Sequence, residues 1–85
     1  MATTQLTLVG KPGCHLCDDA RAVITGVVDE LGDTVRVDEL SILDDPQLFD
    51  RFAEQIPVVL IDGTVHARWR VHAARLRAAL EEVSG

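Results

Sequence analysis

The chain has few cysteines, few aromatic residues and no long hydrophobic run. Of its 85 residues, two are cysteines, one is a tryptophan and none is a tyrosine. The longest unbroken apolar stretch covers residues 56–61 and contains a proline, whereas a transmembrane helix needs about 20 apolar residues. These absences argue against a membrane-spanning helix and against a framework of several structural disulfides.

Basic side chains are also scarce. Eight lysines and arginines stand against 14 acidic residues, which gives a formal net charge of −6. A protein that binds nucleic acid through its phosphates needs a positive surface, so we expect no nucleic-acid partner. The N-terminus, M-A-T-T-Q, has neither the basic nor the apolar segment of a secretory signal, and we therefore expect a cytoplasmic protein.

The length and the overall composition suit one small domain. A chain of 85 residues is too short for two hydrophobic cores. Hydrophobic residues make up 47% and charged residues 26%, as in ordinary globular proteins. Because no linker, repeat or shift in composition divides the sequence, we expect a single domain over residues 1–85, and we expect it to be a monomer.

The first half of the chain has the pattern of a β-α-β unit. Residues 5–9 alternate apolar and polar side chains before the turn sequence G-K-P-G, which predicts a strand. Apolar residues recur at spacings of three and four over 15–31, and Gly32 follows as a helix cap, so this segment is predicted to be a helix. Alternation over 35–38 predicts a second strand, parallel to the first.

The second half predicts a short helix, a hairpin and a last helix. Asp44 or Asp45 can cap a helix that begins with Pro46 and ends near residue 55. The apolar, β-branched segment 56–61 predicts a buried strand, and the D-G turn after it predicts a hairpin into a fourth strand. A last amphipathic helix is expected to begin between 69 and 73 and to end near 83. The predicted fold is α/β, with a four-stranded mixed sheet and three helices in the order β-α-β-α-β-β-α.

Two further groups of side chains are interpreted as structural. The aromatic residues are expected in the core or at its edge, namely Phe49, Phe52 and Trp69. Half of the basic charge lies within ten residues, at Arg68, Arg70, Arg75 and Arg77. This cluster could hold an acidic partner, but the favoured interpretation is a solvated helix face balanced by Glu81 and Glu82.

The two cysteines, Cys14 and Cys17, lie where the first predicted strand leads into the first helix. Residues three apart on a helix share one face, with Cβ atoms about 5 to 6 Å apart, so a disulfide between them can form and break. Cys14 falls at the N-cap or first helical position, where free N–H groups and the helix dipole stabilise an anion. We therefore predict that Cys14 is the nucleophile and that Cys17, one turn deeper, is the resolving thiol.

The residues next to the cysteines have opposite effects on the stability of the Cys14 thiolate. The carboxylates of Asp18 and Asp19 would repel a thiolate in the first turn. The imidazole of His15, between the cysteines, would stabilise the thiolate of Cys14 and make the disulfide more oxidising. The alternative is a His15 side chain that points to solvent and does not contact sulfur.

A lone C-x-x-C sequence can also be half of a zinc site or a buried reduced pair. The candidate further metal ligands are His15, His66 and His72, but His66 and His72 are six residues apart and no second cysteine pair exists. The position of the pair after a strand, at the start of a β-α-β helix, favours redox chemistry over metal binding. The rival hypothesis is a module that binds zinc or an iron–sulfur cluster through the same cysteines, including across a dimer.

Pro57 is the second informative residue, since a proline removes a hydrogen-bond donor from a central strand. One explanation is an ordinary trans proline at the first residue of the strand. The other is a cis Ile56–Pro57 bond, which would leave the Ile56 backbone free to pair with an extended substrate segment. The residues alone leave both open.

Two motifs together carry a resemblance to a known family. K-P-G-C-H-L-C-D at 11–18 and Q-I-P-V-V-L-I-D-G at 55–63 resemble the small bacterial glutaredoxin-like proteins of the thioredoxin-fold superfamily, and the match covers nearly the whole chain. The resemblance implies a thioredoxin-like fold, a cis Pro57 beside the cysteines, and Cys14 attacking with Cys17 resolving. It also implies disulfide reduction, with glutathione or a thioredoxin-type system as electron donor.

The chain departs from the family members that use glutathione. Those members typically have Pro-Tyr between the cysteines, Thr-Val before the proline and a later Gly-Gly-x-Asp-Asp-like turn. Here the corresponding sequences are H-L, Q-I and D-G-T. We therefore expect a thioredoxin or a dedicated reductase to be a faster donor than glutathione, which remains a candidate co-substrate.

The resulting hypothesis is a dithiol oxidoreductase. Its substrate is expected to be a disulfide, in a protein or a small molecule, bound at Ile56 and Pro57. Because the two thiols carry the chemistry, we expect no metal and no prosthetic group.

Overall fold

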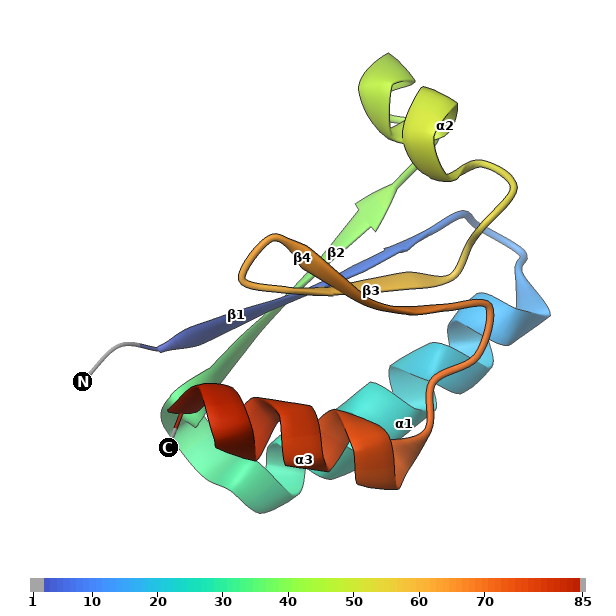
Figure 1. The fold of residues 1–85 in the computed structure, drawn as a ribbon. Coiled ribbons are helices and arrows are strands. Elements are labelled where there is room, and N and C mark those ends of the chain that lie inside the picture. Colours follow the sequence, from blue (N-terminus) through green and yellow to red (C-terminus); the bar gives the residue numbers. More distant parts are fainter. Residues whose placement is uncertain (1–2, 85) are drawn as a thin grey trace.

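The computed structural model describes residues 3–84, which form a four-stranded sheet and three α-helices (Figure 1). A short 3₁₀ helix, Gly32–Thr34, joins the first helix to the second strand. The elements in chain order are β1 (Thr4–Gly10), α1 (His15–Leu31), β2 (Val35–Ser41), α2 (Pro46–Phe52), β3 (Val58–Ile61), β4 (Thr64–Arg68) and α3 (Ala73–Ser84). The predicted order β-α-β-α-β-β-α is confirmed.

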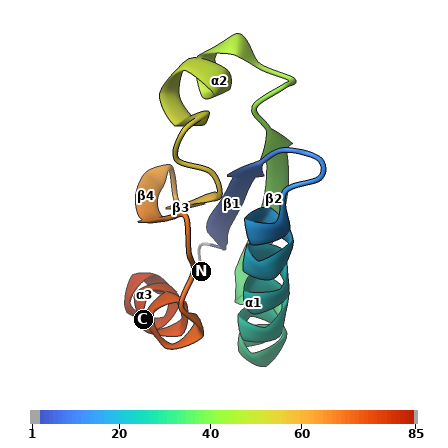
Figure 2. The same ribbon diagram turned by 90° about the vertical axis from the view of Figure 1, so that its right-hand side faces the viewer.

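The sheet is mixed, as expected. Its strand order is β2-β1-β3-β4, with β1 and β2 parallel and the other two pairs antiparallel. Helices α1 and α3 lie side by side on one face of the sheet, and α2 lies on the other (Figure 2). The central strands β1 and β3 are therefore covered on both faces.

The core is divided by the sheet into two clusters. Adjacent residues of a strand point to opposite faces, so Leu8 of β1 packs toward α1 and α3 whereas Val9 packs toward α2. The larger cluster lies between the sheet and the helix pair and includes Leu6, Leu8, Ala20, Ile24, Val27, Val59, Leu76 and Leu80. The smaller cluster, under α2, contains Val9, Ile42, Phe52 and Val58.

The helix ends follow the capping residues in the sequence. Asp45 is the N-cap of α2, and its Oδ1 accepts a hydrogen bond of 2.8 Å from the Gln47 N–H. Gly32, with φ of 71°, follows the last residue of α1 in a conformation that favours glycine. Helix α3 begins at Ala73, the last position of the expected range.

Two of the three aromatic residues expected in the core or at its edge are exposed. Phe52 is buried, but Phe49 is 49% exposed and Trp69 is 53% exposed. Helix α2 packs against the sheet through Phe52 and Leu48, and Phe49 is not part of that cluster. The indole of Trp69 is held outward because its Nε1–H donates to the carbonyl of Glu54 at 3.1 Å.

Within residues 3–84, no helix has the length and apolar character needed to cross a membrane.

Candidate functional site

Three neighbouring strands end beside the start of α1. The pairing of Val9 with Val58 puts Pro57 next to Gly10, the last residue of β1. On the other side, the N–H of Trp69, which follows β4, donates to the Pro57 carbonyl at 2.8 Å. Helix α1 begins five residues after Gly10, so the same end of the sheet carries the cysteines (Figure 1).

Cys14 is the N-cap residue of α1, as predicted. Its backbone is extended, with φ of −96° and ψ of 116°, and its Sγ accepts a hydrogen bond of 3.3 Å from the Cys17 N–H. The sulfur thus takes the place of the side-chain oxygen that usually caps a helix. A thiolate accepts this bond more strongly than a thiol, and it lies at the positive end of the helix dipole. Cys14 is also half-buried and therefore partly accessible to a partner.

Cys17 differs from Cys14 in being almost fully covered, at 1% exposure. Burial raises the pKa of its thiol to about 11, and the hydrogen bond to Cys14 acts in the same direction. The backbone N–H of Lys11 and the guanidinium of Arg21 oppose this rise in pKa. At neutral pH Cys17 is therefore a protonated thiol, and both cysteines are in the reduced form in this structure.

Gly10 is a site residue that the sequence analysis missed. A Cβ atom added to Gly10 would lie 2.7 Å from the Cys17 Sγ and 3.2 Å from its Cβ. The last residue of β1 therefore needs to be glycine so that the strand can end against the buried thiol. The sequence signal was a glycine at the end of a strand, which we interpreted only as the start of a turn.

Arg21 links the first turns of α1 to β2. Its Nε and Nη2 donate to the two carboxylate oxygens of Glu39, each at 2.7 Å, and its Nη1 donates to Asp18 at 2.8 Å. The guanidinium lowers the pKa of the Glu39 carboxyl, and the two carboxylates raise the pKa of Arg21. Asp18, expected to repel the thiolate of Cys14, thus has its charge compensated by a cation.

The second predicted motif lies at the entry to β3. The Ile56–Pro57 peptide bond is cis, and Pro57 is buried. The carbonyls of Gln55 and Pro57 both accept from the Trp69 N–H, at 3.3 and 2.8 Å. Within the described part of the chain, no hydrogen bond involves the backbone of Ile56.

Among residues 3–84, none of the three histidines is hydrogen-bonded to either sulfur atom. His15, the first residue of α1, is exposed, and among residues 3–84 no hydrogen bond or ion pair involves its imidazole. His66 is half-buried on β4, and burial lowers its pKa, while His72 is exposed just before α3. The described residues contain no group of three His, Cys, Asp or Glu side chains placed to hold a metal ion.

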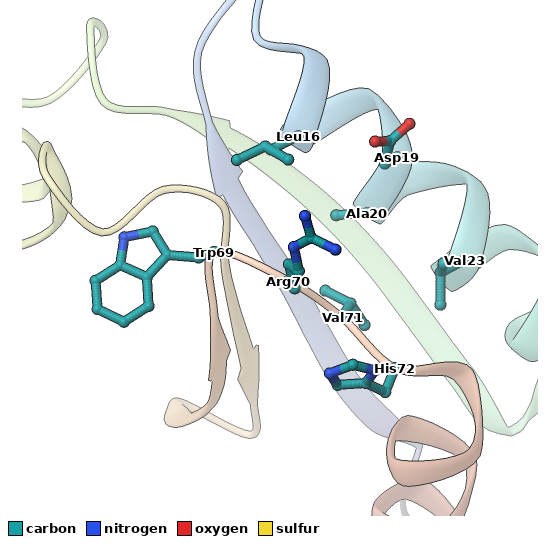
Figure 3. A pocket seen from close by; sticks show the side chains of 8 residues that line it. All are labelled: Leu16, Asp19, Ala20, Val23, Trp69, Arg70, Val71 and His72. Carbon is teal, nitrogen blue, oxygen red and sulfur yellow. The ribbon is translucent and has the colours of Figure 1, made fainter.

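A pocket of about 210 Å³ separates α1 from the connection between β4 and α3. Leu16, which lies between the cysteines in the sequence, forms part of the α1 wall, and residues 69–72 form the other wall. Figure 3 shows the side chain of Arg70 extending toward α1, whereas the ring of Trp69 points away from that helix.

Comparison with known protein families and sequences gives one consistent result. Residues 5–81 match the family described as glutaredoxin-like domain (DUF836). An uncharacterized protein of Mycobacterium tuberculosis is 35% identical, over 92% of this chain and 84% of its own length. A glutaredoxin-like protein of Dictyostelium discoideum is 32% identical, over 86% of this chain and 71% of its own length.

Solved structures share the fold. A structural-genomics target from X. campestris superposes with a TM-score of 0.73 at 30% identity, covering 91% of this chain and 96% of that one. Chloroplastic thioredoxin z superposes with a TM-score of 0.78 at 18% identity, covering 96% of this chain and 79% of that one. The second likeness concerns the fold alone, which is the thioredoxin fold expected from the sequence.

Proposed function

Because the chain belongs to the family of glutaredoxin-like domains (DUF836), we propose that it is a thiol–disulfide oxidoreductase that reduces disulfides through Cys14 and Cys17. The observation that carries the proposal is the difference between the two thiols. Cys14 caps a helix and is partly accessible, whereas Cys17 is buried one turn deeper with its pKa raised to about 11. The first has the environment of an attacking thiolate and the second that of a resolving thiol.

The reaction consists of two exchanges. The Cys14 thiolate attacks one sulfur of the substrate, so that a bond from Cys14 to substrate forms, the substrate disulfide breaks, and the second substrate sulfur leaves as a thiolate. Cys17 then attacks the Cys14 sulfur, forms the Cys14–Cys17 disulfide and releases the first substrate sulfur. The proton of Cys17 goes to a departing substrate thiolate. Two electrons pass to the substrate, and a separate donor must return them.

The substrate in this proposal pairs with the backbone at Ile56. Both backbone groups of Ile56 lack a hydrogen-bond partner within residues 3–84, and the neighbouring Pro57 adjoins the strand end that contacts Cys17. The backbone of an extended substrate segment would form hydrogen bonds with the N–H and the carbonyl of Ile56, as an added strand does at a sheet edge. This would hold the disulfide beside Cys14.

The proposal also covers cofactors, the electron donor, the oligomeric state and the compartment. The two thiols supply the chemistry, so we propose no metal or prosthetic group. A thioredoxin-type reductase or glutathione would serve as electron donor. We propose a monomer in a reducing compartment, the cytoplasm, where such a cysteine pair is kept reduced.

Trapping of the mixed disulfide tests the proposal. Cys17→Ser should accumulate a covalent complex with a disulfide peptide, visible by mass spectrometry, because the second exchange cannot occur. Cys14→Ser should form no such complex at neutral pH, since Cys17 is buried and protonated. Equal trapping by the two variants, or trapping by neither, would contradict the assignment. Metal analysis of the freshly purified protein separates this function from the metal-binding alternative.

A further inference from the structure

The basic side chains of the chain are gathered on one part of its surface. Residues 63–80 contain half of all the basic side chains and no acidic one, while the remaining four basic side chains are set against all 14 acidic ones. A pocket of about 260 Å³ on this segment is lined by Ala67 and by two histidines and three arginines, namely His66, His72, Arg68, Arg70 and Arg75. These five side chains are called the basic patch below.

The basic patch is not neutralised from within the described chain. Arg68 donates through Nε to the neutral side chain of Gln55 at 2.7 Å. Among residues 3–84, the guanidinium groups of Arg70 and Arg75 have no hydrogen bond or ion pair. The expected balancing by Glu81 and Glu82 is wrong, because in the described part of the chain the one ion pair from this segment joins Arg77 to Glu30 of α1. Three arginines therefore remain available to an external anion.

The basic patch adjoins the cysteine pair. Arg70 and His72 also line the pocket beside α1, whose opposite wall includes Leu16 (Figure 3). Two apolar side chains flank this region, Leu16 at 40% exposure and Trp69 at 53%. Trp69 is in turn hydrogen-bonded to Pro57 through its backbone. A partner whose disulfide binds at Cys14 would thus contact the apolar side chains of Leu16 and Trp69 and, beyond them, the arginines of the basic patch.

We propose that the preferred substrates are proteins whose reducible disulfide is flanked by aspartate and glutamate side chains. The inference rests on the proposed function, and it names the class of partner that the same site accepts. Carboxylates near the disulfide would pair with Arg70 and Arg75, which have no ion pair within residues 3–84. The acidic remainder of the surface would repel such a partner in other orientations, so the charge asymmetry would steer its approach.

The test compares three disulfide peptides with the same central sequence and with acidic, neutral or basic flanking residues. Oxidation of the reduced protein by each peptide is followed by stopped flow at low and at high ionic strength. We expect the acidic peptide to react about tenfold faster than the basic one at low salt, and the difference to shrink markedly at 0.5 M salt. The neutral peptide should be affected little by salt.

Substitutions in the basic patch test whether its arginines cause the preference for the acidic peptide. The double variant Arg70→Glu/Arg75→Glu should reverse the order of the acidic and basic peptides, and Arg70→Gln/Arg75→Gln should abolish the preference with less risk to folding. Arg36→Glu is the matched control, because Arg36 is exposed on β2 at the opposite edge of the sheet from β4. It lowers the net charge by the same amount as Arg70→Gln/Arg75→Gln and should keep the wild-type order.

The outcomes for the inference and for the proposed function differ. If the neutral peptide oxidises every variant equally well but the wild type does not prefer the acidic peptide, the inference is overturned and the proposed function stands. A preference that survives both arginine double variants, or that Arg36→Glu reverses, also overturns the inference. If no peptide oxidises the protein, both the proposed function and the inference that rests on it are overturned.

Discussion

The sulfur of Cys17 lies against the backbone of Gly10, so closely that a Cβ at position 10 would be 2.7 Å from it. This contact joins the end of the central strand β1 to the first turn of α1. It explains how a thiol at the end of a sheet can be only 1% exposed. Position 10 therefore controls both packing and the place of the Cys17 thiol.

We expect Gly10→Ala to destabilise the reduced protein by about 1 to 3 kcal/mol, the usual cost of forcing an added methyl group into a packed site. It should also slow the second exchange, because the Cys17 sulfur must move away. Gly26→Ala is the control, since a Cβ on Gly26 in the middle of α1 meets no atom within 4 Å. That variant should gain about 0.5 to 1 kcal/mol through helix propensity. Urea unfolding followed by circular dichroism gives both values, and equal stability of the two variants would contradict the packing argument.

The raised pKa of Cys17 predicts a loss of stability in alkali. Above pH 9.0, the ordinary value, the unfolded thiol releases its proton, whereas the folded thiol keeps it up to about pH 11. The folded state then binds more protons than the unfolded state, so the free energy of unfolding falls as the pH rises through this window. The loss should be at most about 3 kcal/mol, since each pKa unit corresponds to 1.36 kcal/mol.

Urea unfolding of the reduced protein between pH 8 and 11 measures this loss. The chain suits the experiment because it has no tyrosine and a single lysine, so few other groups titrate in the window. Cys17→Ala should start from a lower stability, because it leaves a cavity, but should lose less of it with rising pH. An alkaline decline as steep in Cys17→Ala as in the wild type would rule out Cys17 as its source.

The local features of this fold could be predicted from the sequence. Helix α1 has the predicted bounds because a regular apolar stripe over 15–31 is followed by a glycine cap. The length of β2 could not be predicted, since it runs on to Ser41 through exposed residues such as Val37 and Leu40. Such an edge strand is held by backbone pairing with β1, which leaves little trace in the hydrophobic pattern.

In the candidate site, too, local features could be predicted from the sequence, whereas tertiary contacts could not. The N-cap position of Cys14 followed from a turn, a cysteine and the start of a helix. The Gly10–Cys17 contact, the Arg21–Glu39 pair and the Trp69–Pro57 hydrogen bond join segments that only the tertiary structure brings together. The exposure of Trp69, which is expected in the core or at its edge, could not be predicted for the same reason, because the carbonyl that holds its indole outward lies 15 residues away.

The choice of electron donor is the third prediction. The residues typical of glutathione-using members are absent, and without them glutathione would be poorly oriented toward the sulfur of Cys14. We expect a thioredoxin with its reductase to reduce the oxidised protein about tenfold faster than glutathione, equivalent to about 1.4 kcal/mol of transition-state stabilisation. Coupled NADPH assays with the two donor systems, run on one protein preparation, measure the ratio. Efficient turnover of a glutathione mixed disulfide with glutathione as sole donor would contradict it.

The last prediction concerns His15. A positive imidazole near the Cys14 thiolate stabilises the reduced form, so removing it should make the disulfide less oxidising. The structure limits the size of this effect, since His15 is exposed and its imidazole makes no hydrogen bond or ion pair within residues 3–84. The charge acts only through solvent, and we expect a shift of about 10 mV, below the roughly 30 mV that corresponds to 1.4 kcal/mol for two electrons.

Two substitutions separate charge from packing. His15→Gln should lower the redox potential, because it removes a side chain that can carry positive charge near the Cys14 thiolate. His15→Lys keeps a positive charge at every working pH and should hold the potential at or above the wild-type value. Equilibration with defined thiol–disulfide buffers at two pH values and two salt concentrations measures both variants. If His15→Gln and His15→Lys shift the potential in the same direction, or if high salt leaves the difference between them unchanged, His15 does not tune the site through its charge.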